Sequence, residues 1–336
     1  MKVTVLMTLY NKAAFVEEAA RSVLNGSFQD FELLVVDDAS TDDGVERLRA
    51  LDDPRIRIIR NERNMGRAAS ANVGYAAAQG GYIAVLDADD VQEPDRLQVQ
   101  VAFMDAHPEV GVCGGAARYF GTAEGVRSWP LTDAECRGRS LFTDPVLYGS
   151  CIMRCSVMMA HGLRSNDDWK LPAEDYLFLL TWSPHARFAN VPEVVMRYRI
   201  GEQNQRHGRD PVADRAAVCK EAFRFFGIPL SEAELDVHML FHQLPRTPVD
   251  RDLVRRFLAW ETELIKRVEG LDLFPMDVFR AEVERRRKKA FHLIADSDLA
   301  AASLFIRSRG GVSMKDVSYL AKVTTKRWLG GQAKLD

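Results

Sequence analysis

Hydrophobic residues in the first 115 positions occur in short blocks of two kinds. Residues 3–7, 31–36 and 82–86 are almost continuously apolar, which is typical of strands buried on both faces of a parallel sheet. Between them, runs such as 15–24 place apolar side chains on one side at helical spacing. This alternation predicts βαβ crossovers and therefore an α/β fold, with a mostly parallel, Rossmann-like sheet flanked by helices. The same signals predict further strands at 56–59 and 110–113 and helices at 44–51, 67–78 and 94–107.

The hydrophobic pattern changes twice along the rest of the chain. It weakens after about residue 116, where Gly and Pro interrupt it, and it becomes helical after 211. Apolar residues at helical spacing are clearest over 253–268. We therefore predict a catalytic domain over 1–210 and a helical C-terminal region over 211–336. In the weaker stretch the pattern predicts a helix at 174–182 and strands at 186–191 and 195–200.

The composition is that of a soluble globular protein. The 336 residues are 47% hydrophobic and 28% charged, which excludes disorder over the whole chain. No apolar run approaches the roughly 18 residues that a membrane span needs, and the apolar start reaches Tyr10 too soon for a secretory signal. Five scattered cysteines favour reduced thiols over a disulfide framework. These features predict a cytoplasmic protein.

Positive charge is concentrated near the C-terminus. The chain has a net charge of −3, but residues 280–327 hold 12 Lys and Arg against 5 Asp and Glu. A solvated helix face is one interpretation of this basic region. The other is peripheral contact with anionic lipid headgroups at the inner face of the membrane. No nucleic-acid-binding motif accompanies the basic residues, so we predict no nucleic-acid partner.

Acidic residues follow two of the predicted strands, at the edge where ligands bind in open α/β sheets. Asp37 and Asp38 follow one strand, and Asp87, Asp89 and Asp90 follow another. Carboxylates gathered in one crevice repel one another unless a cation or hydrogen-bond donors compensate them. An Asp-x-Asp pair facing a nucleotide suits Mg²⁺ or Mn²⁺. The alternative is that these acids only cap the helices that follow.

Other nucleotide-binding signatures are missing from the sequence. Neither the dinucleotide fingerprint G-x-G-x-x-G after the first strand nor a P-loop is present. Arg67, by contrast, opens a predicted helix after Asn64 and Gly66. An arginine at a helix N-terminus adds a cation where free N–H groups already favour phosphate.

Taken together, these segments resemble the family-2 glycosyltransferases of the GT-A fold. The resemblance is tight over residues 1–110, thinner over 111–205 and absent beyond about 210. The segments that carry it are Met7-Thr-Leu-Tyr-Asn11, Val36-Asp-Asp-Ala-Ser-Thr-Asp42, Asn64-Met-Gly-Arg-Ala-Ala-Ser-Ala-Asn72, Leu86-Asp-Ala-Asp-Asp90 and Pro94-Asp-Arg-Leu97.

The resemblance implies a donor site for a nucleotide-sugar, with uracil or thymine preferred because Asp38 would accept a hydrogen bond from the imide N–H of the base. Thr8 and Tyr10 would hold the base, Arg67 would meet the phosphates, and Asp87 and Asp89 would bind the metal. It also divides the domain into a donor half, 1–110, and an acceptor half, 111–210. The complete set of predicted donor-binding residues is Thr8, Leu9, Tyr10, Asn11, Asp38, Asn64, Gly66, Arg67, Asp87, Ala88 and Asp89.

Family members also carry a catalytic carboxylate downstream, usually after another acid and at the start of a helix. Glu174 and Asp175 match that pattern. Alone, two acids at a helix N-terminus would more simply satisfy the helix dipole. With the upstream segments, the resemblance implies that Asp175 is the general base of an inverting, hexosyl-type transferase and that Glu174 orients it or contacts a sugar.

One position departs from the family pattern. Gly201 stands where a histidine that can ligate the metal would be expected. His207 could replace it if the loop folds back, and Arg199 or Arg206 could neutralise the diphosphate instead. Mg²⁺ or Mn²⁺ thus remains the predicted cofactor, with strict metal dependence left open.

The acceptor is expected to be a carbohydrate or a lipid-linked carrier in cell-surface polysaccharide or glycolipid assembly. Two alternatives differ in function. A sugar nucleotidyltransferase would be expected to carry a glycine-rich basic loop after the first strand, which the segment after Thr8 lacks. A nucleotide-sugar binding or scaffold protein without turnover is consistent with Gly201.

Overall fold

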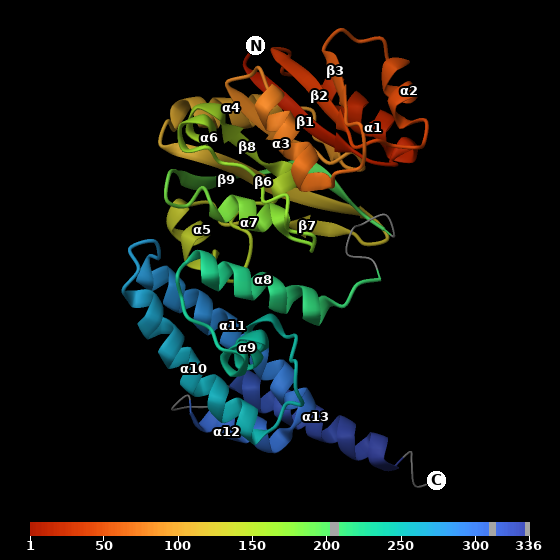
Figure 1. The fold of residues 1–336 in the computed structure, drawn as a ribbon. Helices are drawn as coiled ribbons and strands as arrows, with labels where there is room; N and C mark the ends of the chain where they lie inside the picture. Colours follow the sequence, from red (N-terminus) through yellow and green to blue (C-terminus); the bar gives the residue numbers. More distant parts are fainter. Residues whose placement is uncertain (202–207, 309–313, 333–336) are drawn as a thin grey trace. The chain divides into compact units, whose positions relative to one another are not determined.

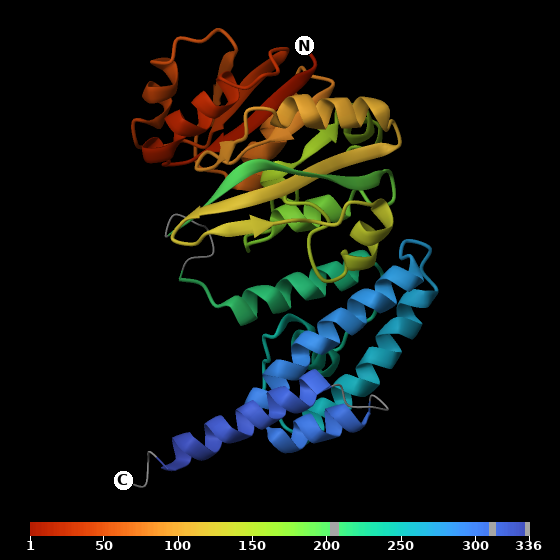
Figure 2. The same ribbon diagram turned by 180° about the vertical axis from the view of Figure 1, so that it is seen from behind.

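The computed structural model describes residues 1–201, 208–308 and 314–332. It divides the chain into two compact units, Met1–Arg209 and Asp210–Asp336, whose ribbons are drawn from opposite sides in Figures 1 and 2. Within the described residues, the first unit combines a sheet with helices and the second contains helices only.

The strands of the first unit form one mixed sheet in the order β3-β2-β1-β4-β8-β6-β9-β5, with β7 paired to β6. Neighbouring strands from β3 to β4 are parallel, as are β6 and β9, whereas β8 is antiparallel to both its neighbours. The described strands are β1 (Val3–Leu9), β2 (Phe31–Asp37), β3 (Ile56–Arg60), β4 (Tyr82–Val85), β5 (Val91–Gln92), β6 (Val110–Gly121), β7 (Gly125–Arg127), β8 (Ile152–Arg154) and β9 (Arg187–Ile200). The α/β prediction with helices flanking a Rossmann-like sheet is confirmed.

Strand β9 corrects the prediction of two separate strands at 186–191 and 195–200. The register on β6 jumps where Gly115 pairs with Val191 and Ala116 with Val194. Pro192 and Glu193 therefore bulge out of the ladder without ending the strand, because a bulge accommodates a residue that cannot donate a hydrogen bond.

Helices cover both faces of this sheet, as its continuously apolar strands require. On β1, Val5 and Met7 pack in one cluster with residues of α1, α2 and α4, while Leu6 belongs to a second cluster with α3, α6 and α7. The described helices of this unit are α1 (Ala13–Leu24), α2 (Gly44–Arg49), α3 (Arg67–Ala77), α4 (Arg96–Ala106), α5 (Asp133–Arg139), the 3-10 turn η1 (Tyr148–Ser150), α6 (Cys155–His161) and α7 (Glu174–Leu180).

Helix α4 begins later than predicted. The sequence places Pro94 in its first turn, but the first helical residue is Arg96. The N–H of Arg96 is bonded to the carbonyl of Glu93, and the Pro94 carbonyl accepts from Ser27. Pro94 thus belongs to a turn that ties the start of α4 to the loop after α1.

The second unit has a core of aromatic side chains. Phe257, Phe279, Phe291 and Phe305 are each at most 1% exposed. Its described elements are α8 (Pro211–Phe225), α9 (Glu232–His238), η2 (Met239–His242), α10 (Arg251–Glu269), α11 (Met276–Ser297), α12 (Leu299–Arg307) and α13 (Met314–Gln332). The apolar face predicted over 253–268 is the buried side of α10. Among the described residues, no helix has the length and apolar character needed to cross a membrane.

Candidate active site

A cavity of about 730 Å³ opens at the carboxyl ends of β1, β2 and β4 in the first unit. Its volume lies within the range of roughly 300 to 1,000 Å³ typical of small-molecule sites. Asp175, at the start of α7, lines the same cavity. The other predicted site residues that line it are Thr8, Leu9, Tyr10, Asp38, Asn64, Gly66, Arg67, Asp87, Ala88 and Asp89.

Three predicted site residues lie outside the cavity lining and support it instead. Asn11 accepts a hydrogen bond from the Thr41 N–H at 2.8 Å and so joins the loops after β1 and β2. Glu174 is only 6% exposed and binds Arg67. Arg199 donates to the Asp89 carbonyl at 2.8 Å and to Glu18 at 2.6 Å.

The remaining two predicted contacts, Arg206 and His207, lie outside the described residues. Gly201 is described and follows Ile200, the last residue of β9. Arg199 is not among the cavity-lining residues, and its guanidinium is bonded to Glu18 and to the Asp89 carbonyl; its contact with the diphosphate stays a prediction.

Asp38 organises the loop that precedes α3. One carboxylate oxygen accepts hydrogen bonds from Asn61 at 2.9 Å and the Met65 N–H at 2.8 Å, and the other accepts from the Gly66 N–H at 2.8 Å. Burial alone would raise the pKa of Asp38, but these donors lower it below the ordinary value. Asp38 is therefore an ionised, 3% exposed anchor at the cavity wall.

Gly66 makes that loop possible. Its φ of +92° is a conformation that side-chain-bearing residues rarely adopt. It directs the Gly66 N–H to Asp38 and places Arg67 as the first residue of α3.

Arg67 joins the two halves of the cavity. Its guanidinium binds Glu174 at 2.5 Å and Asp175 at 3.0 Å, and lies 3.6 Å from Asp87. Burial would lower the pKa of Arg67, but the charges of Asp175, Glu174 and Asp87 raise it well above the ordinary value. Arginine at this point holds a carboxylate from the end of β4 beside two from α7.

The turn before α7 is strained in a way that places the two acids. Ala173 has a φ of +72°, which is uncommon for a residue with a Cβ and is often associated with functional sites. The following residues, Glu174 and Asp175, are thereby presented together to the guanidinium of Arg67.

Acidic charge at the end of β4 exceeds what neighbouring cations balance. Burial, together with the charges of Asp89 and Asp175, raises the pKa of Asp87 to about 6 despite Arg67. Burial and Asp87 likewise raise the pKa of Asp90, whose Oδ2 atom has no hydrogen-bond partner among the described residues. Carboxylates gathered this closely form a donor set that suits a hard divalent cation. Asp87 and Asp89 therefore fit Mg²⁺ or Mn²⁺.

Lys12 is a cavity residue that sequence reasoning missed. It lines the cavity, and its Nζ lies 2.7 Å from Oδ2 of Asp89. Its position directly after Tyr10 and Asn11, at the exit of β1, is the signal that could have identified it.

The far wall of the cavity was also missed. Arg127 lies 4.5 Å from the centre of the Trp129 ring, and the indole N–H of Trp129 donates to Asp144 at 2.8 Å. Tyr119 and Tyr198 pack against each other on the same wall. All five residues line the cavity. Tyr119, Arg127 and Tyr198 come from β6, β7 and β9, and Trp129 and Asp144 come from irregular segments before and after α5, so no regular spacing marks them.

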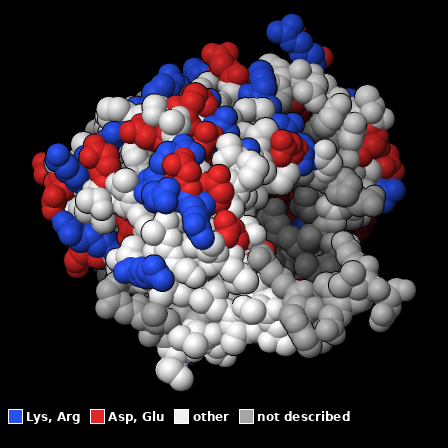
Figure 3. Space-filling view, turned by 90° about the horizontal axis from the view of Figure 1, so that it is seen from below, with Lys and Arg blue, Asp and Glu red and all other residues white. Residues whose placement is uncertain are grey.

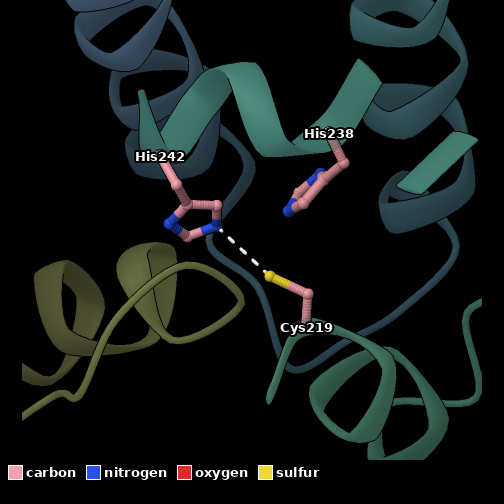
Figure 4. Close-up of side chains that lie close together, drawn as sticks. All are labelled: Cys219, His238 and His242. Atoms are coloured by element: carbon pink, nitrogen blue, oxygen red, sulfur yellow. Dashed lines mark hydrogen bonds between the residues drawn. The ribbon is translucent and has the colours of Figure 1, made fainter. Parts of the chain in front are cut away.

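A second group of possible metal ligands lies in the second unit. Cys219, His238 and His242 offer ligand atoms within 4.8 Å of one another (Figure 4). Sγ of Cys219 lies 3.4 Å from Nε2 of His242. The indole N–H of Trp260 donates to Nδ1 of His238 at 3.3 Å. An indole only donates, so the neutral His238 ring carries its proton on Nε2.

A metal on Nε2 of His238 would have to displace that proton or break the bond to Trp260. Burial lowers the pKa of His238 to about 3, and the rings of Phe223, Phe241 and Trp260 surround it. The arrangement is therefore that of a packed core, and we assign no metal to it.

The basic region near the C-terminus is largely paired with acids. Arg285 and Arg286 both bind Glu282, at 2.5 and 2.6 Å, and Arg287 lies 3.3 Å from Glu261. On the face drawn in Figure 3, Lys and Arg side chains lie among Asp and Glu side chains. The described part of this region thus has the character of a charged helix face with its own counter-charges.

Comparison with known proteins identifies the family to which the chain belongs. The model of the family "Glycosyl transferase family 2" matches residues 4–160. EpsE of Bacillus subtilis, a candidate glycosyltransferase, is 31% identical over 240 residues, covering 69% of this chain and 85% of that protein. The chain belongs to glycosyl transferase family 2.

For other relatives the match spans a smaller share of the relative's own length. An uncharacterized glycosyltransferase of Haemophilus influenzae is 30% identical over 59% of this chain, and the match spans 65% of that protein. The succinoglycan biosynthesis protein ExoO of Rhizobium meliloti is 37% identical over 39% of this chain and 40% of its own.

Among solved structures, residues 1–349 of TarS from S. aureus in complex with UDP-GlcNAc have a similar fold. The TM-score is 0.60 at 20% sequence identity, with 86% of this chain and 92% of that chain covered. The likeness establishes the GT-A fold predicted from the sequence.

Proposed function

We propose that this protein is an inverting glycosyltransferase that moves a sugar, of hexosyl type, from a UDP-sugar to a hydroxyl group of an acceptor. The observation that carries the proposal is that Asp38, Asp89 and Asp175, far apart in the sequence, line one cavity. The family supplies the reaction class, and the cavity supplies the arrangement of residues.

On the donor side, Thr8, Tyr10 and Asp38 would hold the nucleobase. Tyr10 is 47% exposed, so its ring is accessible for stacking on a flat base. Asp38 accepts hydrogen bonds from Asn61, Met65 and Gly66, and the imide N–H of uracil would be a further donor to the same carboxylate. TarS was solved with UDP-GlcNAc, which supports a uridine donor here.

The diphosphate would lie beside Asp87 and Asp89. A Mg²⁺ or Mn²⁺ ion held by these two carboxylates would neutralise negative charge on the leaving group. Arg67, at the N-terminus of α3, adds a cation and free N–H groups next to the same position.

In the transfer step, Asp175 would take the proton of the acceptor hydroxyl while the oxygen of that hydroxyl forms a bond to the anomeric carbon. The bond from that carbon to the diphosphate oxygen breaks, its electron pair leaves with UDP, and the configuration inverts. Arg67 fixes the Asp175 carboxylate by one N–H at 3.0 Å. Glu174 holds the same guanidinium, so it acts on the base through Arg67.

The acceptor would enter along the wall that carries Trp129 and Tyr198. Aromatic rings stack on sugar faces, so this wall suits a carbohydrate acceptor, free or lipid-linked. We place the reaction in polysaccharide assembly in the cytoplasm, because a relative is named for succinoglycan biosynthesis. Peripheral membrane contact through residues 280–327 is part of the proposal, supported by the excess of 12 Lys and Arg over 5 Asp and Glu in this segment.

The test is a panel of UDP-, dTDP- and GDP-sugars, each with and without Mn²⁺. A ligand at 100 times its dissociation constant stabilises the native state by about 2.7 kcal/mol, which a thermal-shift assay detects. Release of nucleotide diphosphate is measured in parallel. We expect stabilisation by UDP-sugars and slow donor hydrolysis. Tight binding without any release, under all conditions and with acceptor extracts, would favour a binding protein without turnover. The absence of binding by every donor would overturn the proposal.

A further inference from the structure

Lys12 forms an ion pair with Asp89, one of the two carboxylates that would bind the proposed metal ion. Its Nζ lies 2.7 Å from Oδ2 of Asp89, and the two side chains are 22% and 13% exposed. Both residues line the cavity. The ammonium is therefore inside the proposed diphosphate site.

The main chain holds both partners of this ion pair in place. The carbonyl of Lys12 accepts the N–H groups of Phe15 and Val16 at 2.9 and 3.0 Å, at the start of α1. Arg199 donates to the carbonyl of Asp89 at 2.8 Å. A lysine stem fixed at its base and a carboxylate fixed at its backbone make this contact a feature of the site, unlike an ion pair between two exposed side chains.

A divalent cation and an ammonium group compete for one carboxylate. Mg²⁺ binds carboxylate oxygen at about 2.0 to 2.1 Å and requires near-octahedral geometry. An ammonium 2.7 Å from that oxygen would crowd the ion and repel it, because like charges at short range in a partly desolvated site interact strongly. The acids around Asp87 need positive charge, and Lys12 is one of the cations that can supply it.

We propose that Lys12 is an exchangeable counter-ion of this site. Without a donor it competes with the divalent cation for Asp89, and with a donor bound its ammonium moves onto the diphosphate. The inference rests on the proposed function, since it takes a nucleoside diphosphate as the ligand. Lysine suits this part because its charge sits on a flexible stem with three donors that can be redirected.

The experiment uses Lys12→Met in the full chain, which keeps the stem volume and removes the charge. Mn²⁺ binding without nucleotide is measured from the electron paramagnetic resonance signal of the free ion. UDP binding is measured by calorimetry in EDTA. We expect Mn²⁺ to bind at least tenfold more tightly and UDP without metal to bind at least fivefold more weakly.

Lys2→Met is the matched control, because Lys2 also pairs with an aspartate, Asp105 at 3.0 Å, but at an exposed position outside the cavity lining. Its two affinities should equal those of the wild type. If Lys12→Met leaves either affinity within twofold of the wild type, with an unchanged thermal midpoint, the proposal is overturned. If Lys12→Met does not fold, Lys12→Gln takes its place, and we expect the same two changes in Mn²⁺ and UDP affinity.

Failure of the proposed function would look different. In that case the wild type itself would bind no UDP under any condition. The Mn²⁺ measurement on Lys12→Met would still report whether the ammonium and the ion compete for Asp89, and Asp89→Asn should then weaken Mn²⁺ binding in both backgrounds.

Discussion

The two units of this chain differ in what they bury. The first unit buries charged side chains around its cavity, among them Asp38, Asp90, Arg96 and Glu174, none more than 6% exposed. The second buries a core of phenylalanines, and its buried carboxylate, Glu282, lies between two arginines that neutralise it.

This difference separates residues kept for chemistry from residues kept for stability. Burying a charge is unfavourable unless it is paired, and Asp87 has a raised pKa because its charge is only partly balanced. A fold maximising stability alone would not gather such groups. The core of the second unit is mainly apolar, so burial of apolar area is the main source of its stability.

The largest expected effect is on transfer in Asp175→Asn. Amide oxygen cannot accept the acceptor's proton, so the transfer rate should fall by about 10² to 10⁴, the usual contribution of a general base. UDP affinity should stay within twofold, because Asp175 is proposed to act on the acceptor hydroxyl and not on the nucleotide. Asp167→Asn is the control, since the Asp167 side chain is 40% exposed, pairs with Arg164 and lies outside the cavity lining. Transfer by Asp175→Asn at the wild-type rate would rule out its role as base.

In the second unit, Phe257→Ala should lower the free energy of unfolding by about 3 to 5 kcal/mol, the range for removing a buried aromatic ring. Phe257 is fully buried on α10. Denaturant unfolding measures the loss, and calorimetry should show unchanged UDP affinity because every cavity-lining residue belongs to the first unit. Phe225→Ala, at a 38% exposed position, should have a much smaller effect. If Phe257→Ala and Phe225→Ala lowered the free energy of unfolding equally, the second unit would not depend on its buried phenylalanine core.

Acid should weaken the second unit through the buried His238 and the half-buried His242. Burial lowers the pKa of His238 to about 3 and that of His242 well below its ordinary value, and the charge of Arg286 adds to both shifts. Both rings are neutral in the folded state, so stability is full above the unfolded pKa of about 6.5. It is lost as pH falls toward the folded pKa.

Each histidine should contribute about 1.4 kcal/mol per pH unit below about 6.5. Unfolding curves from pH 7 to 5 measure the slope, and His238→Gln should reduce it by half. His292→Gln, at an exposed position, should leave the slope unchanged. A pH-independent stability over this range would show that the two rings do not stay neutral in the folded state.

A smaller effect is expected from Gly66→Ala in the first unit. A residue with a Cβ at a φ of +92° costs about 1 to 3 kcal/mol, and the strain falls on the Gly66 N–H that Asp38 binds. Both stability and UDP affinity should therefore decrease. Gly270→Ala is the control, because Gly270 has an ordinary φ of −84° and open space around it. Unchanged UDP affinity in Gly66→Ala would separate this loop from the donor site.

Much of the fold could be predicted because parallel strands buried on both faces leave a plain apolar signal. The carboxyl ends of those strands share an edge, which is why Asp38 and Asp89 could be assigned to one site. Asp175 could be added only through the family resemblance, since no local pattern shows that Arg67 reaches across to α7. The catalytic roles of these residues stay predictions.

There are physical reasons why the sequence did not reveal the remaining cavity residues. Arg127 lies on the short β7 and Trp129 in an irregular segment, so neither belongs to a periodic pattern. Lys12 has the appearance of a surface residue at the start of a helix, and only the position of Asp89 across the sheet shows what it contacts. Tertiary proximity of this kind is not encoded in spacing.

The most direct test of the account is a crystal structure of the protein with UDP and Mn²⁺. We expect the diphosphate in the cavity beside Asp89, the uracil N–H facing Asp38, and the Asp175 carboxylate directed at the space that the sugar would occupy. Nucleotide bound elsewhere on the chain, with the cavity empty, would contradict the central claim that the three aspartates serve one donor.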